Sequence, residues 1–240
     1  MPVLFTPLYR LYATAALLVI FLLFGALLIV SPGLQRRRRI ARAGSRWALR
    51  ASGQPLRVSG LEHLPQRACV AVANHASYLD SLVLAAALPE RFTFVVQDGA
   101  ARWPYVGLVI RRMGVIFVDR GARVGARQTR ALLRRLKRNE SLAVFAEGTF
   151  AAEPGLLPFR RGAFLIAAHA GVPMLPVAIR GTRRLLGEHQ RLLRPTPVEV
   201  ELLPCVPASA DPGYLLKTVR GAIAARCGEP DLQPALKSDV

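Results

Sequence analysis

The sequence predicts an α/β protein with a largely parallel mixed sheet flanked by helices, preceded by an N-terminal transmembrane or membrane-inserted helix. Short apolar runs alternate with longer helical patterns beyond residue 55, which is typical of a parallel sheet. A separate apolar segment lies near the N-terminus. The 240 residues, 52% of them hydrophobic, are enough for one sizeable core. We expect an anchor and basic helix over 1–50, a globular domain over 51–228 and a flexible tail over 229–240.

The anchor is predicted from Leu11–Val30, where every residue is apolar or small except Tyr12 and Thr14. Twenty helical residues span about 30 Å, which matches the hydrocarbon core of a bilayer. Arginines follow this segment and Arg10 alone precedes it, so the positive-inside rule places the rest of the chain on the cytoplasmic side of the cytoplasmic (inner) membrane. A signal peptide has the opposite charge asymmetry, and a buried core helix is seldom so long. The segment either spans the membrane or inserts as a shallow hairpin with the next helix.

The net charge of +18 indicates an anionic partner: nucleic acid, an anionic membrane surface or a phosphate-bearing substrate. Six arginines closely follow the anchor, at positions 36–39, 42 and 46, together with Trp47. We expect them to form a belt on anionic lipid, where each arginine contributes about 1 kcal/mol. The three cysteines are far apart and match no metal-binding spacing.

Seven strands and six helices are expected after the anchor. The strands are predicted at Pro55–Gly60, Cys69–Ala73, Phe92–Gln97, Val115–Val118, Leu142–Phe145, Met174–Ile179 and Val198–Leu203. The helices are predicted at 34–53, 80–88, 99–112, 123–138, 160–170 and 211–227. Cations crowd the helix over 123–138, which we interpret as a solvated face or, alternatively, as a face toward anionic lipid. The basic turn Gly181–Arg184 is expected to be solvated.

His75 and Asp80 stand where the strand at 69–73 passes into the helix at 80–88, a position that often holds the chemistry of α/β proteins. With His75 in the loop and Asp80 in the first helical turn, the carboxylate can reach an imidazole nitrogen. That contact would fix the tautomer and make the other nitrogen a general base. The alternative is structural: Ser77 and Asp80 also have the spacing of a helix capping box.

Further polar residues follow other predicted strands. Arg120 comes just after the strand at 115–118, and Glu147, Gly148 and Thr149 follow the strand at 142–145. The carboxyl ends of parallel strands share one rim, so these residues are expected to converge with His75. A base with its orienting carboxylate, arginines and a Gly-Thr turn indicate a site for a hydroxyl nucleophile on an anionic substrate.

Four sequence blocks resemble those of the glycerolipid acyltransferases, a family typified by bacterial lysophosphatidate (1-acylglycerol-3-phosphate) acyltransferases. The blocks are NHxSxxD at 74–80, GxxFVDR at 114–120, FxEGT at 145–149 and VPxxPV at 172–177. They occur in the family's order and spacing over roughly residues 55–185. Each block alone is weak, whereas four in order are specific.

The resemblance implies a membrane-bound O-acyltransferase of phospholipid biosynthesis, with the catalytic domain over 51–228. It would move a fatty acyl group from acyl-CoA or acyl carrier protein to the hydroxyl of lysophosphatidate. His75 would accept the hydroxyl proton and Asp80 would orient the imidazole. The expected partners are the lysophospholipid, the acyl donor and an anionic membrane surface, with no nucleic acid, no bound cofactor and no metal. The residues expected to bind substrate are Asn74, Ser77, Arg120, Glu147, Gly148, Thr149, Arg160 and Arg161.

Three departures from the family pattern leave the acceptor open. Ala146 replaces a usual proline, Phe150 replaces a usual arginine, and Gln97 replaces a frequent lysine. Arg160 or Arg161 can substitute for the missing arginine. The alternatives are an acyltransferase for another lysolipid, such as a lyso-aminolipid or a lysophospholipid with a larger headgroup, and a non-catalytic basic membrane adaptor.

Overall fold

The computed structural model describes residues 5–118, 125–187 and 190–232. Its strands are β1 (Leu56–Ser59), β2 (Val70–Ala73), β3 (Phe92–Gln97), β4 (Ile116–Val118), β5 (Ser141–Phe145), β6 (Met174–Arg180) and β7 (Val198–Leu202). Its helices are α1 (Phe5–Val30), α2 (Leu34–Ala51), α3 (Asp80–Ala87), α4 (Pro104–Arg112), α5 (Ala126–Lys137), α6 (Gly162–Ala170), α7 (Thr182–Leu185) and α8 (Pro212–Cys227), with 3₁₀ turns η1 (Leu61–His63) and η2 (Asp98–Arg102).

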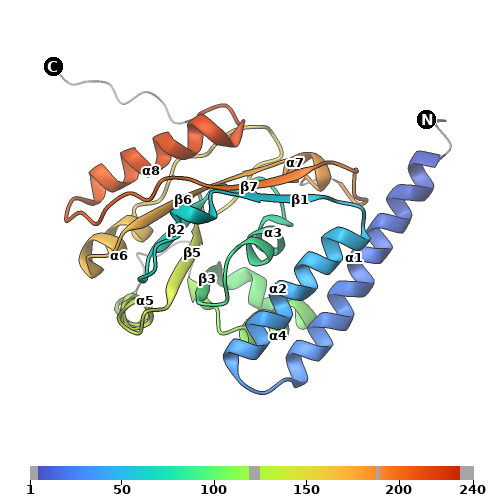
Figure 1. Ribbon diagram of the computed structural model, residues 1–240, viewed down its shortest axis with the longest axis horizontal. Helices are drawn as coiled ribbons and strands as arrows, with labels where there is room; N and C mark the ends of the chain where they lie inside the picture. The colour runs from blue at the N-terminus through green and yellow to red at the C-terminus, as the bar shows by residue number, and fades with distance from the viewer. Residues whose placement is uncertain (1–4, 119–124, 188–189, 233–240) are drawn as a thin grey trace.

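The strands form one sheet in the order β1-β7-β6-β2-β5-β3-β4. Every neighbouring pair is parallel except β6 and β7, which run antiparallel. This confirms the predicted mixed, largely parallel sheet. β2 lies in the middle, between β5 and β6, so the loop that follows it emerges at the centre of the rim (Figure 1).

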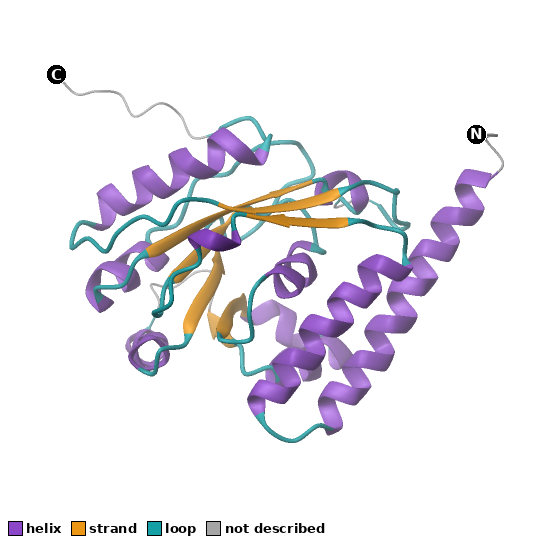
Figure 2. Ribbon diagram, in the orientation of Figure 1, coloured by secondary structure: helices purple, strands orange, loops and turns teal. Residues whose placement is uncertain are grey.

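The sheet separates two hydrophobic cores, with helices on both faces (Figure 2). Alternate residues of β2 point to opposite faces: Ala71 and Ala73 belong to the core under α3, while Val70 and Val72 belong to the core under α5, α6 and α8. Burial on both faces explains why the central strands read as continuous apolar runs.

α1 and α2 form a helical hairpin beside the sheet (Figure 1). Pro7–Val30 of α1 is long and apolar enough to cross a membrane, and only 17% of its most apolar window is buried in the protein. The start of α1 rests on a loop of the globular domain, because Arg10 donates from Nε to the Leu193 carbonyl at 3.2 Å. Thr14 accepts the Leu193 N–H at 3.0 Å.

Arg38 departs from the predicted lipid-facing belt. Its side chain is 7% exposed and pairs with Glu140 at 3.1 Å. It also donates to the Thr93 hydroxyl at 2.6 Å and to the Glu90 carbonyl at 3.2 Å. The neighbouring Arg46 donates to the Ala86 carbonyl of α3 at 2.8 Å. Arg38 and Arg46 therefore tie the hairpin to the globular domain, and the exposed arginines of α2 are Arg36, Arg39, Arg46 and Arg50.

Two further local predictions need correction. The basic turn at Gly181–Arg184 contains the short helix α7, and Arg183 is not solvated: it pairs with Glu229 at 2.8 Å and is 14% exposed. Glu229 belongs to the predicted flexible tail, yet its carboxylate also accepts the Gly155 N–H at 2.7 Å. Leu232 of the same segment donates its N–H to the Leu156 carbonyl at 3.2 Å.

Candidate active site

The site lies where β2 and β5 end side by side, with Ala73 paired to Phe145. The residues that follow β2 form the loop from Asn74 to Leu79, and those that follow β5 form the turn around Gly148. The two segments therefore lie side by side, as the sequence predicts. The third predicted contributor, Arg120, lies outside the described residues.

His75 and Asp80 are in direct contact, with His75 Nδ1 and Asp80 Oδ2 2.8 Å apart. Asp80 is fully buried, whereas the His75 side chain is 17% exposed. The same Asp80 oxygen accepts the backbone N–H groups of Ala76 at 2.6 Å and Ser77 at 2.8 Å. Because this oxygen only accepts, Nδ1 carries the proton and the unprotonated lone pair is on Nε2. This is the tautomer that a general base requires.

The capping-box alternative is only partly present. α3 begins at Asp80 with Leu79 at its N-cap, so Ser77 precedes the cap. The Ser77 hydroxyl donates to the Leu186 carbonyl at 2.6 Å and accepts the Leu79 N–H at 3.1 Å. Asp80 thus both holds the loop through its backbone and orients His75. The two interpretations of the motif are compatible.

Asn74 is buried, and its side-chain amide forms the same pair of hydrogen bonds that a neighbouring strand would form through its backbone. Its Oδ1 accepts the Ile179 N–H at 2.7 Å, and its Nδ2 donates to the Ile179 carbonyl at 2.9 Å. These bonds to β6 fix the point at which the chain leaves the sheet. Asn74 and Ser77 were expected to bind substrate. In the structure their side chains form hydrogen bonds with backbone groups, and neither residue lines the cavity described below.

Glu147 is 3% exposed, and both of its oxygens accept backbone N–H groups. Oε1 bonds His75 at 2.7 Å and Oε2 bonds Leu157 at 2.8 Å. Burial raises the pKa of this carboxyl to about 7, although the two N–H groups and Arg220 act in the opposite direction. Glu147 therefore links the loop of His75 to the segment that leads to α6. The sequence instead predicts that Glu147 contacts substrate.

Gly148, Thr149, Arg160 and Arg161, which the sequence predicts to bind substrate, line the cavity. Gly148 has a φ of +72°, and a Cβ on it would lie 2.7 Å from Arg160 Nε. Arg160 donates from that Nε to the Glu147 carbonyl at 3.3 Å, so its guanidinium lies across the Gly148 turn. The turn thus requires glycine for its backbone conformation and for the close approach of the arginine.

Aromatic rings enclose His75. Phe145 stacks on the imidazole, with ring centroids 4.3 Å apart and planes 17° apart. Phe150 meets the imidazole edge to face at 4.7 Å, and Tyr78 meets Phe150 at 4.8 Å. The sequence prediction noted Phe150 only as a departure from the family pattern. The available signal was the presence of two phenylalanines that flank the Glu-Gly-Thr turn.

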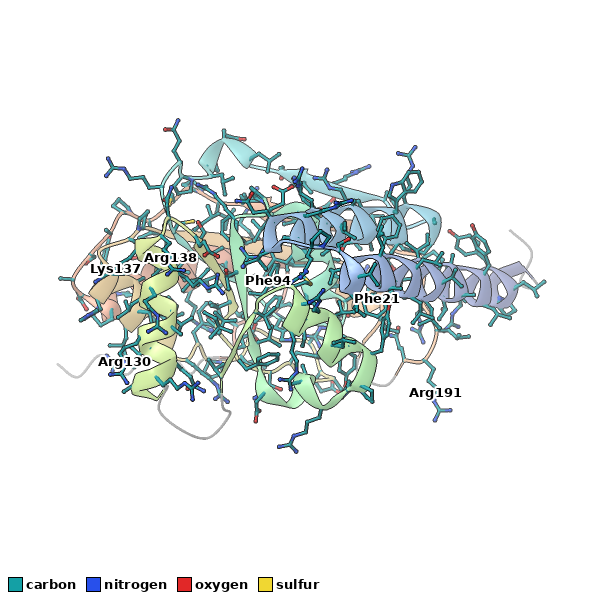
Figure 3. All side chains as sticks on the ribbon, turned by 90° about the horizontal axis from the view of Figure 1, so that it is seen from below. Phe21, Phe94, Arg130, Lys137, Arg138 and Arg191 are labelled. Carbon is teal, nitrogen blue, oxygen red and sulfur yellow. The ribbon has the colours of Figure 1, made fainter. Side chains whose placement is uncertain are left out.

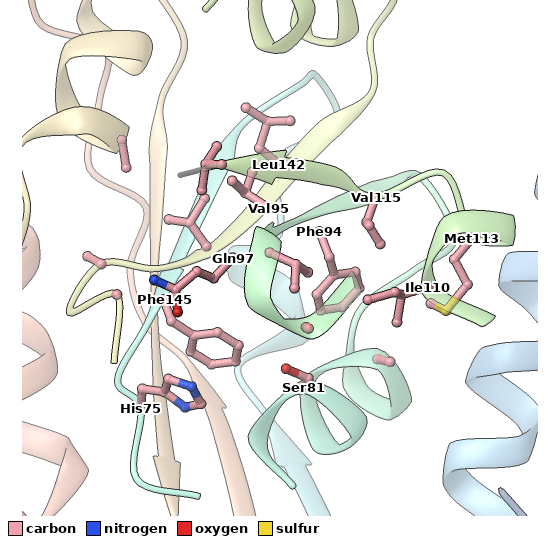
Figure 4. A pocket seen from close by; sticks show the side chains of 18 of the residues that line it. His75, Ser81, Phe94, Val95, Gln97, Ile110, Met113, Val115, Leu142 and Phe145 are labelled. Atoms are coloured by element: carbon pink, nitrogen blue, oxygen red, sulfur yellow. The ribbon is translucent and has the colours of Figure 1, made fainter. Parts of the chain in front are cut away.

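A cavity of about 2070 Å³ opens at His75, with mainly apolar walls. Figure 4 shows His75 and Phe145 at one end, with Phe94, Ile110 and Met113 leading away from them. One part of the cavity is lined by α1 residues such as Phe21 and Leu28, and another part by α5 and α6. Among the described residues, no group of three or more His, Cys, Asp or Glu side chains is placed to hold a metal ion.

Comparison with known proteins decides the family. The family model described as Acyltransferase matches residues 55–180, which is more than half of the chain and includes both site segments. The chain belongs to the Acyltransferase family. The resemblance inferred from the four sequence blocks is confirmed.

Several relatives carry the name 1-acyl-sn-glycerol-3-phosphate acyltransferase. The chain is 34% identical over 132 residues to 1-acyl-sn-glycerol-3-phosphate acyltransferase BAT2, chloroplastic, of Brassica napus, covering 54% of this chain and 38% of that protein. It is 32% identical to the human 1-acyl-sn-glycerol-3-phosphate acyltransferase beta, covering 60% and 52%, and 28% identical to the Neisseria gonorrhoeae enzyme, covering 70% and 64%. The chain spans less than two fifths of the first relative's length and about half of the second's.

A solved structure shares the fold. The 1-acyl-sn-glycerophosphate acyltransferase PlsC from Thermotoga maritima superposes with a TM-score of 0.76 at 23% identity, covering 92% of this chain and 94% of that chain. The match extends beyond residues 55–180 and therefore includes most of the N-terminal hairpin.

Proposed function

We propose that this Acyltransferase-family protein is a membrane-bound enzyme that transfers a fatty acyl group from a thioester to the hydroxyl of lysophosphatidate in phospholipid synthesis. The observation that carries the proposal is the His75–Asp80 pair at the mouth of a long apolar cavity. The names of the relatives support lysophosphatidate as the acceptor.

His75 acts as the general base in the proposed mechanism. Nε2 takes the proton from the acceptor hydroxyl as its oxygen attacks the thioester carbonyl, and Asp80 stabilises the imidazolium that forms. The tetrahedral intermediate then collapses: the C–S bond breaks and His75 returns the proton to the leaving sulfur. One C–O bond replaces one C–S bond, and no covalent acyl-enzyme is formed.

Backbone N–H groups of the Gly148 turn are suited to stabilise the oxyanion of that intermediate. The Gly148 N–H itself is bonded to the Phe145 carbonyl at 3.0 Å. Thr149 and Phe150 line the cavity, and their N–H groups have no hydrogen-bond partner among the described residues. We assign the oxyanion site to these two groups, since donors already in place stabilise developing charge without reorganisation.

Arg160 is the proposed contact for the acceptor phosphate, with the exposed Arg161 next to it. Both arginines line the cavity, and Arg160 is fixed across the Gly148 turn close to His75. A guanidinium matches phosphate geometry through paired hydrogen bonds. Arg120, outside the described residues, remains a predicted phosphate ligand.

The hairpin is the proposed membrane attachment, because acceptor and product are lipids. Exposed apolar residues follow α1 along its length, among them Leu8, Leu11, Leu18, Leu22 and Val30. Trp47 of α2 and Trp103 beside α4 are also exposed, as suits an interfacial position. α1 also lines the cavity, so a lipid tail can pass between membrane and site.

Acyl transfer by the purified, detergent-solubilised protein tests the proposal. Labelled long-chain acyl-CoA or acyl carrier protein is offered with lysophosphatidate, a lyso-aminolipid and lysophospholipids with larger headgroups. We expect product with lysophosphatidate. Product only with another lysolipid would assign that lysolipid as the acceptor in place of lysophosphatidate. No product with any donor and acceptor would refute the proposed activity.

A further inference from the structure

One face of α5 carries an exposed row of positive charge. Arg127, Arg130, Arg134, Lys137 and Arg138 recur at helical spacing, and each is exposed. Figure 3 shows three of them, Arg130, Lys137 and Arg138, projecting from the helix. We call these five residues the α5 stripe.

The stripe has no counter-charge in the described part of the chain. Its five side chains form no ion pair there, whereas Arg135 of the same helix pairs with Glu140 at 2.9 Å. The first turn of α5 contains no acidic residue, so Arg127 faces the positive end of the helix dipole. Like charges three and four residues apart also repel one another. Arg134 and Lys137 lie in the last turn, where the dipole favours cations, so the unfavourable terms are the position of Arg127 and the like-charge pairs. An anionic partner would relieve both.

α5 joins this surface to the active site. Thr129 and Leu132 of α5 line the cavity that opens at His75, and Leu165 of α6 lines it while 52% exposed. The helix that carries the stripe therefore also forms part of the cavity wall. α5 begins shortly after β4, whose carboxyl end lies on the catalytic rim, so Arg127 is the stripe residue nearest that rim.

The length of the stripe favours a protein over a small anion. Arg127 to Arg138 spans about 16 Å, or about three helical turns. One phosphate or diphosphate engages only part of such a row, whereas the acidic face of a partner helix engages all of it.

A lipid surface fits the stripe less well. Exposed large apolar residues occur on α1 and at Trp103 and Leu108, but the described residues of α5 contribute none. Helices that lie in the membrane interface combine a basic face with exposed Trp, Phe or Leu. Both views place α5 at the end of the molecule away from α1 (Figures 1 and 3).

We propose that the α5 stripe docks an acidic protein that carries the acyl thioester, that is, an acyl carrier protein, and so directs the donor into the cavity beside α5. The proposal rests on the proposed acyltransferase function. It adds a donor-recognition surface that is separate from the lipid-binding hairpin.

The test compares two donors with one acyl chain, carried on purified acyl carrier protein or on CoA. The stripe variant is Arg127→Gln, Arg130→Gln, Arg134→Gln and Lys137→Gln, since glutamine preserves helix propensity. The matched control removes four exposed cations elsewhere: Arg67→Gln, Arg191→Gln, Arg194→Gln and Lys217→Gln. Both variants are assayed in detergent with lysophosphatidate, and their binding to phosphatidylglycerol vesicles is measured by sedimentation.

We expect the stripe variant to raise the KM for the acyl carrier protein thioester about tenfold, with kcat and the acyl-CoA KM within about twofold of wild type. The control variant should change neither KM. Equal loss with both donors, unchanged KM with both, or no use of acyl carrier protein by the wild type would each overturn the docking proposal. A loss confined to vesicle binding would assign the stripe to lipid. Turnover of acyl-CoA in the same assay tests the acyltransferase function separately.

Discussion

The Glu147 carboxylate accepts a hydrogen bond from the backbone N–H of His75 at 2.7 Å. Its other oxygen bonds Leu157 at 2.8 Å, so one buried side chain joins the β2 loop to the chain that enters α6. Asp80 holds the His75 side chain, and Glu147 holds its backbone. Asp80 and Glu147, which come from different sequence blocks, therefore position the same histidine from different directions.

Glu147→Gln is expected to lower kcat by about 10- to 100-fold and to leave the acceptor KM within about threefold. The amide can accept one of the two N–H groups, but its NH₂ faces the other donor and releases that segment. Steady-state kinetics with varied lysophosphatidate provide the measurement. A large rise in the acceptor KM with normal kcat would restore direct substrate binding as the role of Glu147.

The pKa of Glu147 also predicts a pH dependence of stability. Its folded-state pKa is about 7 and its ordinary value is 4.5, so the folded protein holds a proton that the unfolded chain releases. The free energy of unfolding should therefore fall as the pH rises from about 4.5 to about 7, by roughly 3 kcal/mol from this group. Denaturant unfolding of wild type and Glu147→Gln at several pH values isolates the effect. A constant difference between the two proteins across this range would contradict it.

Phe150 is expected to hold the imidazole in place. Phe150→Ala removes two aromatic contacts, to His75 and Tyr78, worth together about 1 to 3 kcal/mol, and opens the site to water. We expect kcat to fall several-fold for Phe150→Ala and to stay near wild type for Phe150→Tyr. Equal kinetics for alanine and tyrosine would show that the ring does not position His75.

Arg38→Met should destabilise the fold by about 3 kcal/mol, because it removes one of the two arginine partners of Glu140 and leaves Thr93 and two carbonyls without the donor that Arg38 supplies. Arg39→Met, at an exposed position of the same helix, should change stability by less than about 0.5 kcal/mol. Thermal unfolding measures both. Loss of vesicle binding by Arg38→Met at unchanged stability would support the lipid-facing role instead.

The strands were predictable because the central ones are buried on both faces and appear as uninterrupted apolar runs. β2, β5 and β6 illustrate this, with observed bounds within one residue of the predicted ones. The predicted helix at 99–112 was wrong in detail: η2 covers Asp98–Arg102 and α4 begins at Pro104. Proline at the first position of a helix was the available signal.

The site was predictable in its histidine–aspartate contact, because the five-residue spacing across a loop permits that geometry. Individual roles depended on tertiary partners that a single sequence does not show. Asn74 bonds β6 from 105 residues away, and Ser77 bonds Leu186 from 109 residues away. The sequence does not distinguish Arg38 from the neighbouring arginines, because its partners Glu140 and Thr93 are distant in the chain.

The most direct test of the central claim is the single-turnover rate of acyl transfer from acyl-CoA to lysophosphatidate by His75→Ala. His169→Ala is the matched control, since His169 also lines the cavity and, within the described structure, has no carboxylate partner. We predict a loss of about 10²- to 10⁴-fold for His75→Ala and a rate within about threefold of wild type for His169→Ala, with both variants folded. A folded His75→Ala protein that retains near-normal turnover would contradict the assignment of His75 as the general base.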